Sequence, residues 1–259
     1  MNLYAGDLGD LDPRNELERL LTAVRDAGEQ PLGPLFAALA RTHPVALAEV
    51  VCGPRSPGGE AVVRAGLVHI DVLEAALSPR GAYPRLAELG GEAGTAVLAV
   101  AAHRHPAASW LLQLSRRVER ENAGATHLFA AAGHPSFAQA CRMHAEVGHV
   151  EGLVLAASGT GRPEPAAALL AVHLDPPARA NPMLPLDAAL RAAAAALDAN
   201  PDAAVMAHLA AVWGPEPDDL LVRLVPRLRR RDAAEALLTR SRHLPRTRAV
   251  LTAVIPGMR

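Results

Sequence analysis

Apolar and polar residues follow the period of an α-helix along most of the chain. Apolar side chains recur at spacings of one, three and four, which places them on one stripe of a helix, and most charged residues fall off that stripe. No segment shows the strict alternation between hairpin turns that predicts a strand. Alanine and leucine, which favour helices, fill most of these segments. The clearest stripes are Trp110, Leu111, Leu114 and Val118; Leu220, Leu221, Leu224, Val225 and Leu228; and Val250, Leu251, Val254 and Ile255.

Four short junctions interrupt the helical pattern, and each ends in a His-Pro or Asn-Pro pair. Proline disfavours helical backbone at the residue before it, and it fits the first position of a new helix, where its missing N–H costs nothing. We therefore expect one helix to end before each pair and the next to begin at the proline. The prolines of these pairs are Pro44, Pro106, Pro135 and Pro201.

Helix starts of this kind recur at a fairly even spacing along the chain. Together with the four prolines, Asp71, Pro165 and Asp232 give a mean step of about 31 residues, which is typical of stacked helical repeats. Helices of about 8–14 residues are marginal alone in water and become stable by packing on their neighbours. The sequence predicts an all-α fold, a right-handed superhelical array of short antiparallel helix pairs (an α-solenoid). A compact, irregular all-helical globule is the alternative.

At these junctions the chain resembles HEAT-like solenoids, especially the leucine-rich-repeat-variant type, in which a His-Pro or Asn-Pro pair separates short helices. The most similar segment is Val100–Leu112, which reads VAAHRHPAASWLL. The resemblance touches about half of the chain and implies an array of stacked helices. Such families share no catalytic residues, so the resemblance assigns no residue a role.

Glycine and proline concentrate in three segments, 53–59, 158–165 and 175–185. A length of 259 residues fits one large domain or two small ones. We expect one helical-repeat domain over residues 1–259. A sub-boundary in the loop 175–185 would separate an N-terminal array (1–174) from a basic C-terminal array (186–259).

The expected compartment follows from what the sequence lacks. Residues 1–12 are acidic and contain no apolar run, so they do not resemble a signal peptide. The longest apolar stretches fall short of the ~20 residues needed to span a bilayer. Cys52 and Cys141 are too few for a disulfide framework. These features predict a cytoplasmic protein.

Composition excludes several classes of enzyme. All 26 basic residues are arginine, so no lysine is available for a Schiff base or a P-loop. Two cysteines cannot make a four-thiolate metal site. Ser158 lacks the first glycine of a nucleophile elbow, and the Gly159–Arg162 segment follows no predicted strand. We predict a non-enzymatic protein without a cofactor.

One cluster of histidines raises the question of a metal site. His134, Cys141, His144, His149 and Glu151 lie close together in sequence. Cys141 and His144 are three residues apart, so they share a helix face that a zinc ion could bridge. No second pair with a recognised spacing accompanies them, and a cysteine in such a helix is more often a small core residue. We predict no metal site, with Cys141 and His144 as weak candidates.

Charge is distributed unevenly along the chain. Residues 1–50 contain eight acidic residues and four arginines, whereas residues 220–259 contain ten arginines and two acidic residues. Arg223, Arg227 and Arg230 recur at helical spacing opposite the leucine stripe. Pro226 lies within this segment and should kink the helix or restart it. The candidate basic patch comprises Arg223, Arg227, Arg229, Arg230, Arg231, Arg240, Arg242, Arg246 and Arg248.

Three interpretations of this patch stay open: binding of phosphates, binding of an acidic protein surface, and a merely solvated face. Our preferred hypothesis is a non-enzymatic scaffold that binds a protein partner through its concave face, with the basic end orienting the partner. The alternative is sequence-independent nucleic-acid binding through the arginines. Contact between the acidic N-terminal and basic C-terminal ends would also allow a homo-oligomer.

Overall fold

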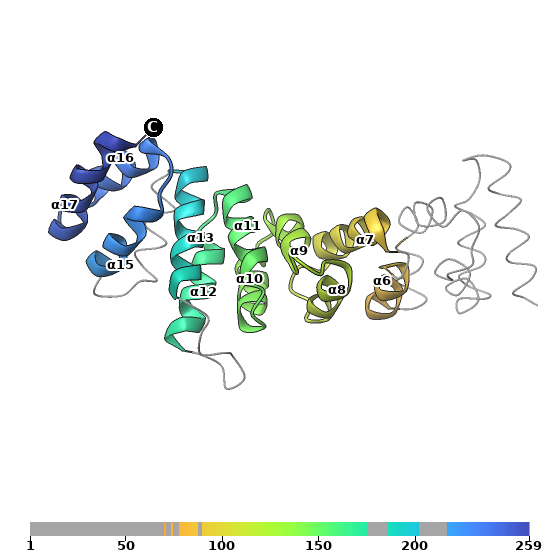
Figure 1. Cartoon of the computed structure of the whole chain (residues 1–259). Coiled ribbons are helices and arrows are strands. Elements are labelled where there is room, and N and C mark those ends of the chain that lie inside the picture. The colour runs from red at the N-terminus through yellow and green to blue at the C-terminus, as the bar shows by residue number, and fades with distance from the viewer. Residues whose placement is uncertain are drawn as a thin grey trace, which may run out of the picture. The chain divides into compact units, whose positions relative to one another are not determined.

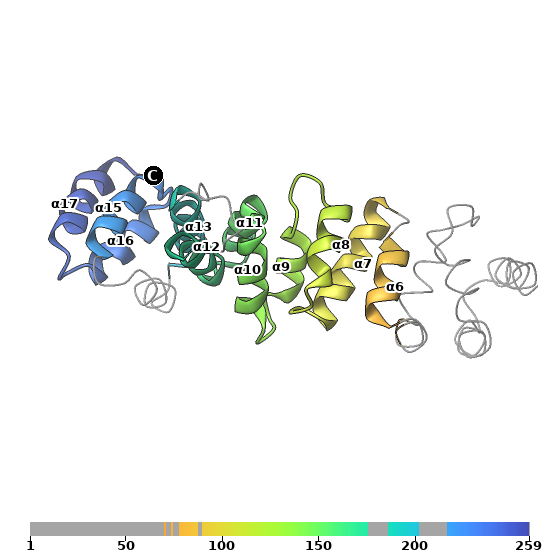
Figure 2. The same ribbon diagram turned by 90° about the horizontal axis from the view of Figure 1, so that it is seen from below.

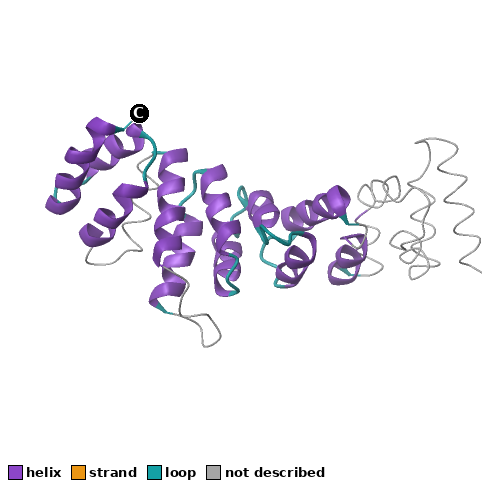
Figure 3. Ribbon diagram, viewed as in Figure 1, coloured by secondary structure: helices purple, strands orange, loops and turns teal. Residues whose placement is uncertain are grey.

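The computed structural model of the chain describes residues 70, 74, 78–87, 90–175, 186–201 and 217–258. Every regular element in these ranges is a helix, and none of these residues lies in a strand (Figure 3). The predicted all-α class is therefore confirmed. The acidic N-terminal segment, Pro44, Cys52, Asp71 and most of the loop 175–185 lie outside the described residues, so what was predicted for them stays a prediction.

The chain divides into two compact units, Met1–Ala101 and Ala102–Arg259. In the first unit the structure describes α6 (Pro79–Ala87) and most of α7 (Gly91–Arg104). Tyr83, Leu86, Val97 and Leu98 are fully buried there. The spacing of these four residues follows the helical period, so each helix buries one apolar face.

The second unit contains the helices that build the candidate site (Figure 1). Two short 3₁₀ turns, η1 and η2, follow α15 and α17. The elements are α8 (Trp110–Val118), α9 (Ala125–Ala131), α10 (Phe137–Glu146), α11 (Val150–Thr160), α12 (Glu164–Leu174), α13 (Leu186–Ala199), α15 (Pro217–Leu224), η1 (Val225–Arg227), α16 (Arg231–Arg240), α17 (Pro245–Val254) and η2 (Ile255–Gly257).

Helices of this unit pack mainly on elements that lie near them in the chain. Helix α9 packs on α11, α10 packs on α12, and α11 packs on α13. Toward the C-terminus, α13 contacts α15, and α15 contacts α17 (Figures 1 and 2). Each short helix thus buries its apolar face on helices one or two positions away in the chain.

Helix α13 occupies the centre of the apolar core. It packs against α11, α12, α15, α16 and η1. Its side chains on this core are mostly alanine, and small side chains allow neighbouring backbones to approach closely. The buried residues of α13 are Ala188, Ala189, Leu190, Ala192, Ala193, Ala194, Ala196 and Leu197.

Prolines separate the helices as predicted, but two helices begin later than predicted. Helix α7 ends at Arg104 and α8 begins at Trp110, and α9 ends at Ala131 and α10 begins at Phe137. Neither Pro106 nor Pro135 is therefore the first residue of its helix. After Pro106 a turn intervenes, because the Ala108 amide donates to the His105 carbonyl and the Leu111 amide to the Ala108 carbonyl.

The other predicted helix starts agree more closely with the observed ones. Pro165 lies in the first turn of α12, which begins at Glu164. Helix α16 begins at Arg231, next to the predicted Asp232. Helix α15 ends at Leu224, and Pro226 lies in the 3₁₀ turn that follows, so the predicted interruption is confirmed.

Three helix N-termini receive carboxylates from other elements. The first amides of a helix have no partner within it, so an acceptor there is stabilising. Glu119 accepts from the Gly124 and Thr126 amides of α9, both at 2.9 Å. Asp198 accepts from the Arg229 and Arg230 amides before α16. Asp218 accepts from the Arg246 and Thr247 amides of α17 at 3.2 and 2.8 Å.

Gly152 marks the closest approach between α11 and the segment that leads into α9. A β-carbon at this position would lie 2.5 Å from the Ala123 carbonyl oxygen and 3.1 Å from the Ala125 amide nitrogen. Both atoms belong to the backbone, which yields less easily than a side chain. The packing of α11 on α9 therefore requires glycine here.

We expect Gly152→Ala to lower the free energy of unfolding by about 1–3 kcal/mol, because the added methyl group forces the two backbones apart. Alanine favours a helix interior by up to about 1 kcal/mol over glycine, so a net loss would show that the steric effect dominates. Urea unfolding followed by circular dichroism measures the change.

The matched control is Gly133→Ala, where a β-carbon would meet no atom within 4 Å. We expect this variant to unfold within about 0.5 kcal/mol of the unmodified protein. Equal stability of the two alanine variants would contradict the close approach at Gly152.

Candidate functional site

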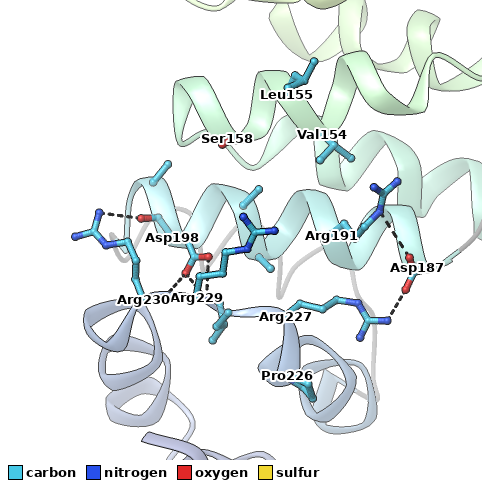
Figure 4. Close-up of a pocket in the computed structure, with 14 residues that line it drawn as sticks. Val154, Leu155, Ser158, Asp187, Arg191, Asp198, Pro226, Arg227, Arg229 and Arg230 are labelled. Carbon is cyan, nitrogen blue, oxygen red and sulfur yellow. Dashed lines mark hydrogen bonds and ion pairs between the residues drawn. The ribbon is translucent and has the colours of Figure 1, made fainter. Parts of the chain in front are cut away.

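A cleft with a volume of about 910 Å³ opens between α11, α13 and the segment that links η1 to α16 (Figure 4). Its residues on α11 and on α13 are spaced one, three or four apart, so each helix contributes one face. The lining residues are Val154, Leu155 and Ser158 of α11; Asp187, Arg191, Ala194, Ala195, Asp198 and Ala199 of α13; and Pro226, Arg227, Leu228, Arg229 and Arg230.

The side of the cleft toward α11 and the middle of α13 is apolar. Val154 is half-buried, whereas Leu155 has 40% of its surface exposed. Ala194 and Ala195 face them from α13. An exposed leucine beside a concave apolar surface is a feature that favours contact with a ligand or a partner.

Asp198 fixes the backbone on the opposite side of the cleft. Its carboxylate accepts from the Arg229 amide at 3.2 and 3.0 Å and from the Arg230 amide at 3.1 Å. Its carbonyl oxygen accepts from the Arg230 guanidinium at 3.0 Å. One residue at the end of α13 therefore holds two consecutive residues of the cleft wall.

Two cleft arginines are paired with acidic side chains. Arg227 binds Asp187, and this hydrogen bond, together with the nearby positive charges, lowers the pKa of the Asp187 carboxyl group. Arg191 binds Glu151 at 2.7 Å and lies 3.6 Å from Asp187. The hydrogen bond to Glu151 is the main reason that the pKa of Arg191 is raised. The charges of these residues are satisfied within the protein.

The remaining members of the candidate basic patch are distributed over several elements. Arg230 pairs with Asp232, Arg231 with Glu235 at 2.8 Å, and Arg246 with Asp219. Arg240 donates to the Pro201 carbonyl at 3.3 Å. The exposed Arg223, Arg242 and Arg248 lie on α15, on the turn after α16 and on α17. The predicted arginines therefore do not share one helix face.

Arg229 differs from the other arginines of the cleft. Its side chain is exposed, and among the described residues its guanidinium forms no hydrogen bond and no ion pair. Figure 4 shows this side chain extending from the fixed backbone over α13 into the cleft. The cleft thus combines an apolar surface with one guanidinium that has no partner in the described part of the chain.

A second polar feature is a chain of three buried histidines, which we call the histidine chain: His127 of α9, His144 of α10 and His149 before α11. The Arg116 guanidinium contacts His149 Nε2 at 2.9 Å, and His149 Nδ1 contacts His144 Nδ1 at 2.8 Å. His144 Nε2 contacts His127 Nδ1 at 2.7 Å, and His127 Nε2 contacts the Pro106 carbonyl at 2.8 Å.

The two ends of the histidine chain determine the proton positions along it. Arginine can only donate a hydrogen bond and a carbonyl can only accept one. His149 Nε2 must therefore accept, which leaves its Nδ1 to donate to His144 Nδ1. His144 Nε2 then donates to His127, and His127 Nε2 donates to the Pro106 carbonyl. All three rings are neutral in this arrangement, and every ring nitrogen has a partner.

Burial keeps the histidine chain neutral. Burial, together with the neighbouring histidines and Arg116, lowers the pKa of His144 to about 2 and that of His149 to about 4. Burial also lowers the pKa of His127, although the hydrogen bond to the Pro106 carbonyl opposes this effect. Gly124, at φ 94°, leaves room for the His144 ring, because a β-carbon there would lie 2.3 Å from its Nδ1.

The two weak metal candidates, Cys141 and His144, have different surroundings in the structure. Both nitrogens of His144 are occupied by His127 and His149, whereas Cys141 lies in the apolar core, where burial raises the pKa of its thiol. His134 is exposed, and Glu151 pairs with Arg191. Within the described part of the chain, no group of three or more potential ligands could hold a metal ion.

Several residues of these two features could not be singled out from the sequence. His127 and Arg116 lie outside the histidine cluster that the sequence suggested, and their contacts exist only once α8, α9 and α10 pack together. In the sequence, Asp187 and Asp198 look like ordinary acidic residues of a helix. They gain a role only because the fold brings them into contact with residues 31–40 positions away in the chain.

None of the helices in the described ranges has the length and apolar character that crossing a membrane requires. The chain matches no protein-family model, no curated protein and no solved structure.

We expect the protein to lose stability as the pH falls from about 6.5 toward 4. In the unfolded chain these histidines take up protons near pH 6.5, whereas the folded protein resists protonation of His149 until about pH 4. The unfolded state therefore binds more protons in this range, and each such histidine contributes a slope of about 1.4 kcal/mol per pH unit. Urea unfolding between pH 7.5 and 4.5 measures the slope.

The variant His149→Gln should be less stable than the unmodified protein at pH 7.5 and should show a shallower slope below pH 6.5. His134→Gln is the matched control, because His134 is exposed and its ring contacts only the Ser136 amide among the contacts described. A flat profile for the unmodified protein, or the same slope in His149→Gln, would refute the role of the histidine chain.

Proposed function

We propose that this chain is a non-enzymatic helical scaffold that binds a protein partner in the cleft between α11, α13 and the η1–α16 segment. One observation carries the proposal, namely a concave apolar surface with the exposed Leu155 on one side and, on the other, Arg229, whose guanidinium has no partner among the described residues. Apolar surface supplies affinity, and arginine is enriched among the residues that dominate protein–protein binding.

The packing of the second unit supports a scaffold. Its helices bury their apolar faces mainly on elements one or two positions away in the chain, which is the contact pattern of a quasi-one-dimensional array. We propose that these helices form a right-handed α-solenoid. Such an array exposes the ends and faces of several helices along one side, where a partner can bind.

The residues of the cleft favour binding over catalysis. Among the described residues that line the cleft, Ser158 is the only one with a hydroxyl side chain, and none is a histidine or a cysteine that could act as a base or a nucleophile. Asp187 and Asp198 are engaged in ion pairs or in hydrogen bonds to backbone amides. A reaction would need a group that is free to exchange a proton or attack a substrate.

The second candidate function is sequence-independent nucleic-acid binding through the C-terminal arginines. It is favoured by exposed arginines that form no ion pair with an acidic side chain among the described residues. These are Arg223, Arg229, Arg242 and Arg248. The pairing of Arg227, Arg230, Arg231 and Arg246 with carboxylates weighs against it. A partnership of the acidic N-terminal segment with this end stays a prediction.

We expect a tagged full-length protein to capture a partner from nuclease-treated lysate of its host, and we expect Leu155→Glu to abolish the capture. A glutamate there places a charge on the apolar side of the cleft, whereas the exposed position should tolerate it in the fold. Leu174→Glu is the matched control, because Leu174 has 66% of its surface exposed and does not line the cleft. Mass spectrometry of the bound fraction gives the readout.

Equal capture by both glutamate variants would contradict the cleft as the docking surface. For the second candidate, a gel shift with duplex DNA at low salt tests the arginines. Nucleic-acid binding requires an affinity that falls steeply with salt and a slope that flattens when Arg229, Arg230 and Arg231 are changed to alanine. No shift at low salt would exclude this candidate.

A further inference from the structure

We propose that the occupant of the cleft is an acidic linear segment of the partner, with a carboxylate bound by Arg229 and an adjacent apolar side chain against Val154 and Leu155. The inference rests on the proposed function and specifies the chemistry that the cleft recognises.

The ion pairs of the cleft indicate which of its arginines is available to bind a ligand. Four arginines line it, and three of them have carboxylate partners: Glu151 and Asp187 for Arg191, Asp187 for Arg227, and Asp232 for Arg230. Only Arg229 lacks such a partner among the described residues. A guanidinium carries five N–H donors in a planar fork, which matches the two oxygens of a carboxylate.

The backbone that carries Arg229 is already fixed. Both carboxylate oxygens of Asp198 accept from its amide, and the same carboxylate accepts from the next amide. The segment is also bounded by η1 on one side and α16 on the other. A ligand therefore orders only the Arg229 side chain on binding, which reduces the entropic cost of association.

The apolar surface defines the second half of the ligand. Val154, Leu155, Ala194 and Ala195 line the same cleft as Arg229, and all four side chains are apolar. An apolar side chain next to the acid would cover them. It would also exclude water from the guanidinium–carboxylate pair and so strengthen that pair.

The same balance disfavours a polyanion such as nucleic acid. Apart from Arg229, the arginines of the cleft already pair with Asp187, Glu151 and Asp232, so the site has no large excess of positive charge. A phosphate backbone would bring repeated negative charges close to these carboxylates. A ligand with a single carboxylate beside an apolar side chain would bind the Arg229 guanidinium without bringing repeated negative charges close to these carboxylates.

Selection of peptides tests this inference. A phage-displayed library of random dodecapeptides is selected on the full-length protein, and selection on Arg229→Ala is run in parallel. We expect the unmodified protein to enrich aspartate or glutamate next to a large apolar residue, and Arg229→Ala to lose that enrichment. The best peptide, synthesised with a fluorophore, should bind Arg229→Ala about tenfold more weakly by fluorescence polarisation, as expected for a charged hydrogen-bonded pair.

Two comparisons make the result specific. Arg142→Ala removes an exposed arginine of α10 that neither lines the cleft nor belongs to the candidate basic patch, and it should leave the peptide affinity unchanged. A peptide in which glutamine or asparagine replaces each acid should bind the unmodified protein as weakly as the acidic peptide binds Arg229→Ala. Equal affinity of both peptides would overturn the proposal.

The outcomes separate this inference from the proposed function. If no acidic peptide is enriched while Leu155→Glu still abolishes partner capture, the cleft binds a protein of other chemistry and only the inference fails. If capture does not depend on Leu155, the proposed function fails first. Tight, strongly salt-dependent DNA binding that is lost in Arg229→Ala would overturn the acidic segment in favour of a nucleic acid.

Discussion

The need of short helices to bury one apolar face on their neighbours is the constraint on which the second unit depends. Helix α13 meets this need on several sides at once, because its alanine-rich surface lets α11 and α12 approach closely. Its remaining face carries Asp187, Arg191, Ala195 and Asp198. The position of the cleft is therefore a consequence of core packing, since the helix that fills the core also presents these residues to solvent.

Three carboxylates, those of Glu119, Asp198 and Asp218, bind backbone amides at the starts of other helices. None of α9, α16 and α17 has a hydrogen bond from the side chain of its own N-cap residue, and instead Glu119, Asp198 and Asp218 supply acceptors from other elements. Each contact satisfies amides that would otherwise lack a partner and places negative charge at a positive helix end. Acidic residues used in this way connect helices that are one to three positions apart in the chain.

The sequence was sufficient for the helical class and for most breaks between helices, because periodicity and proline act locally. Pro106, Pro135 and Pro226 interrupt helices for the steric reason expected. It was insufficient for the later starts of α8 and α10, since a turn follows Pro106 and Pro135 before each helix begins. The histidine chain was also out of reach, because His127 and Arg116 reach His144 and His149 only through the packing of α8, α9 and α10.

The same limit applies to charge counted along a sequence. Ten arginines against two acidic residues in residues 220–259 suggest a strongly basic end, yet Asp187, Asp198 and Asp219, which precede this stretch, contact several of them in space. The criterion for the proposed binding residue is a position in the cleft without a carboxylate partner among the described residues. Arg229 meets that criterion although its neighbour Arg230 does not, because Asp198 fixes both backbones while Asp232 pairs with only one of the two side chains.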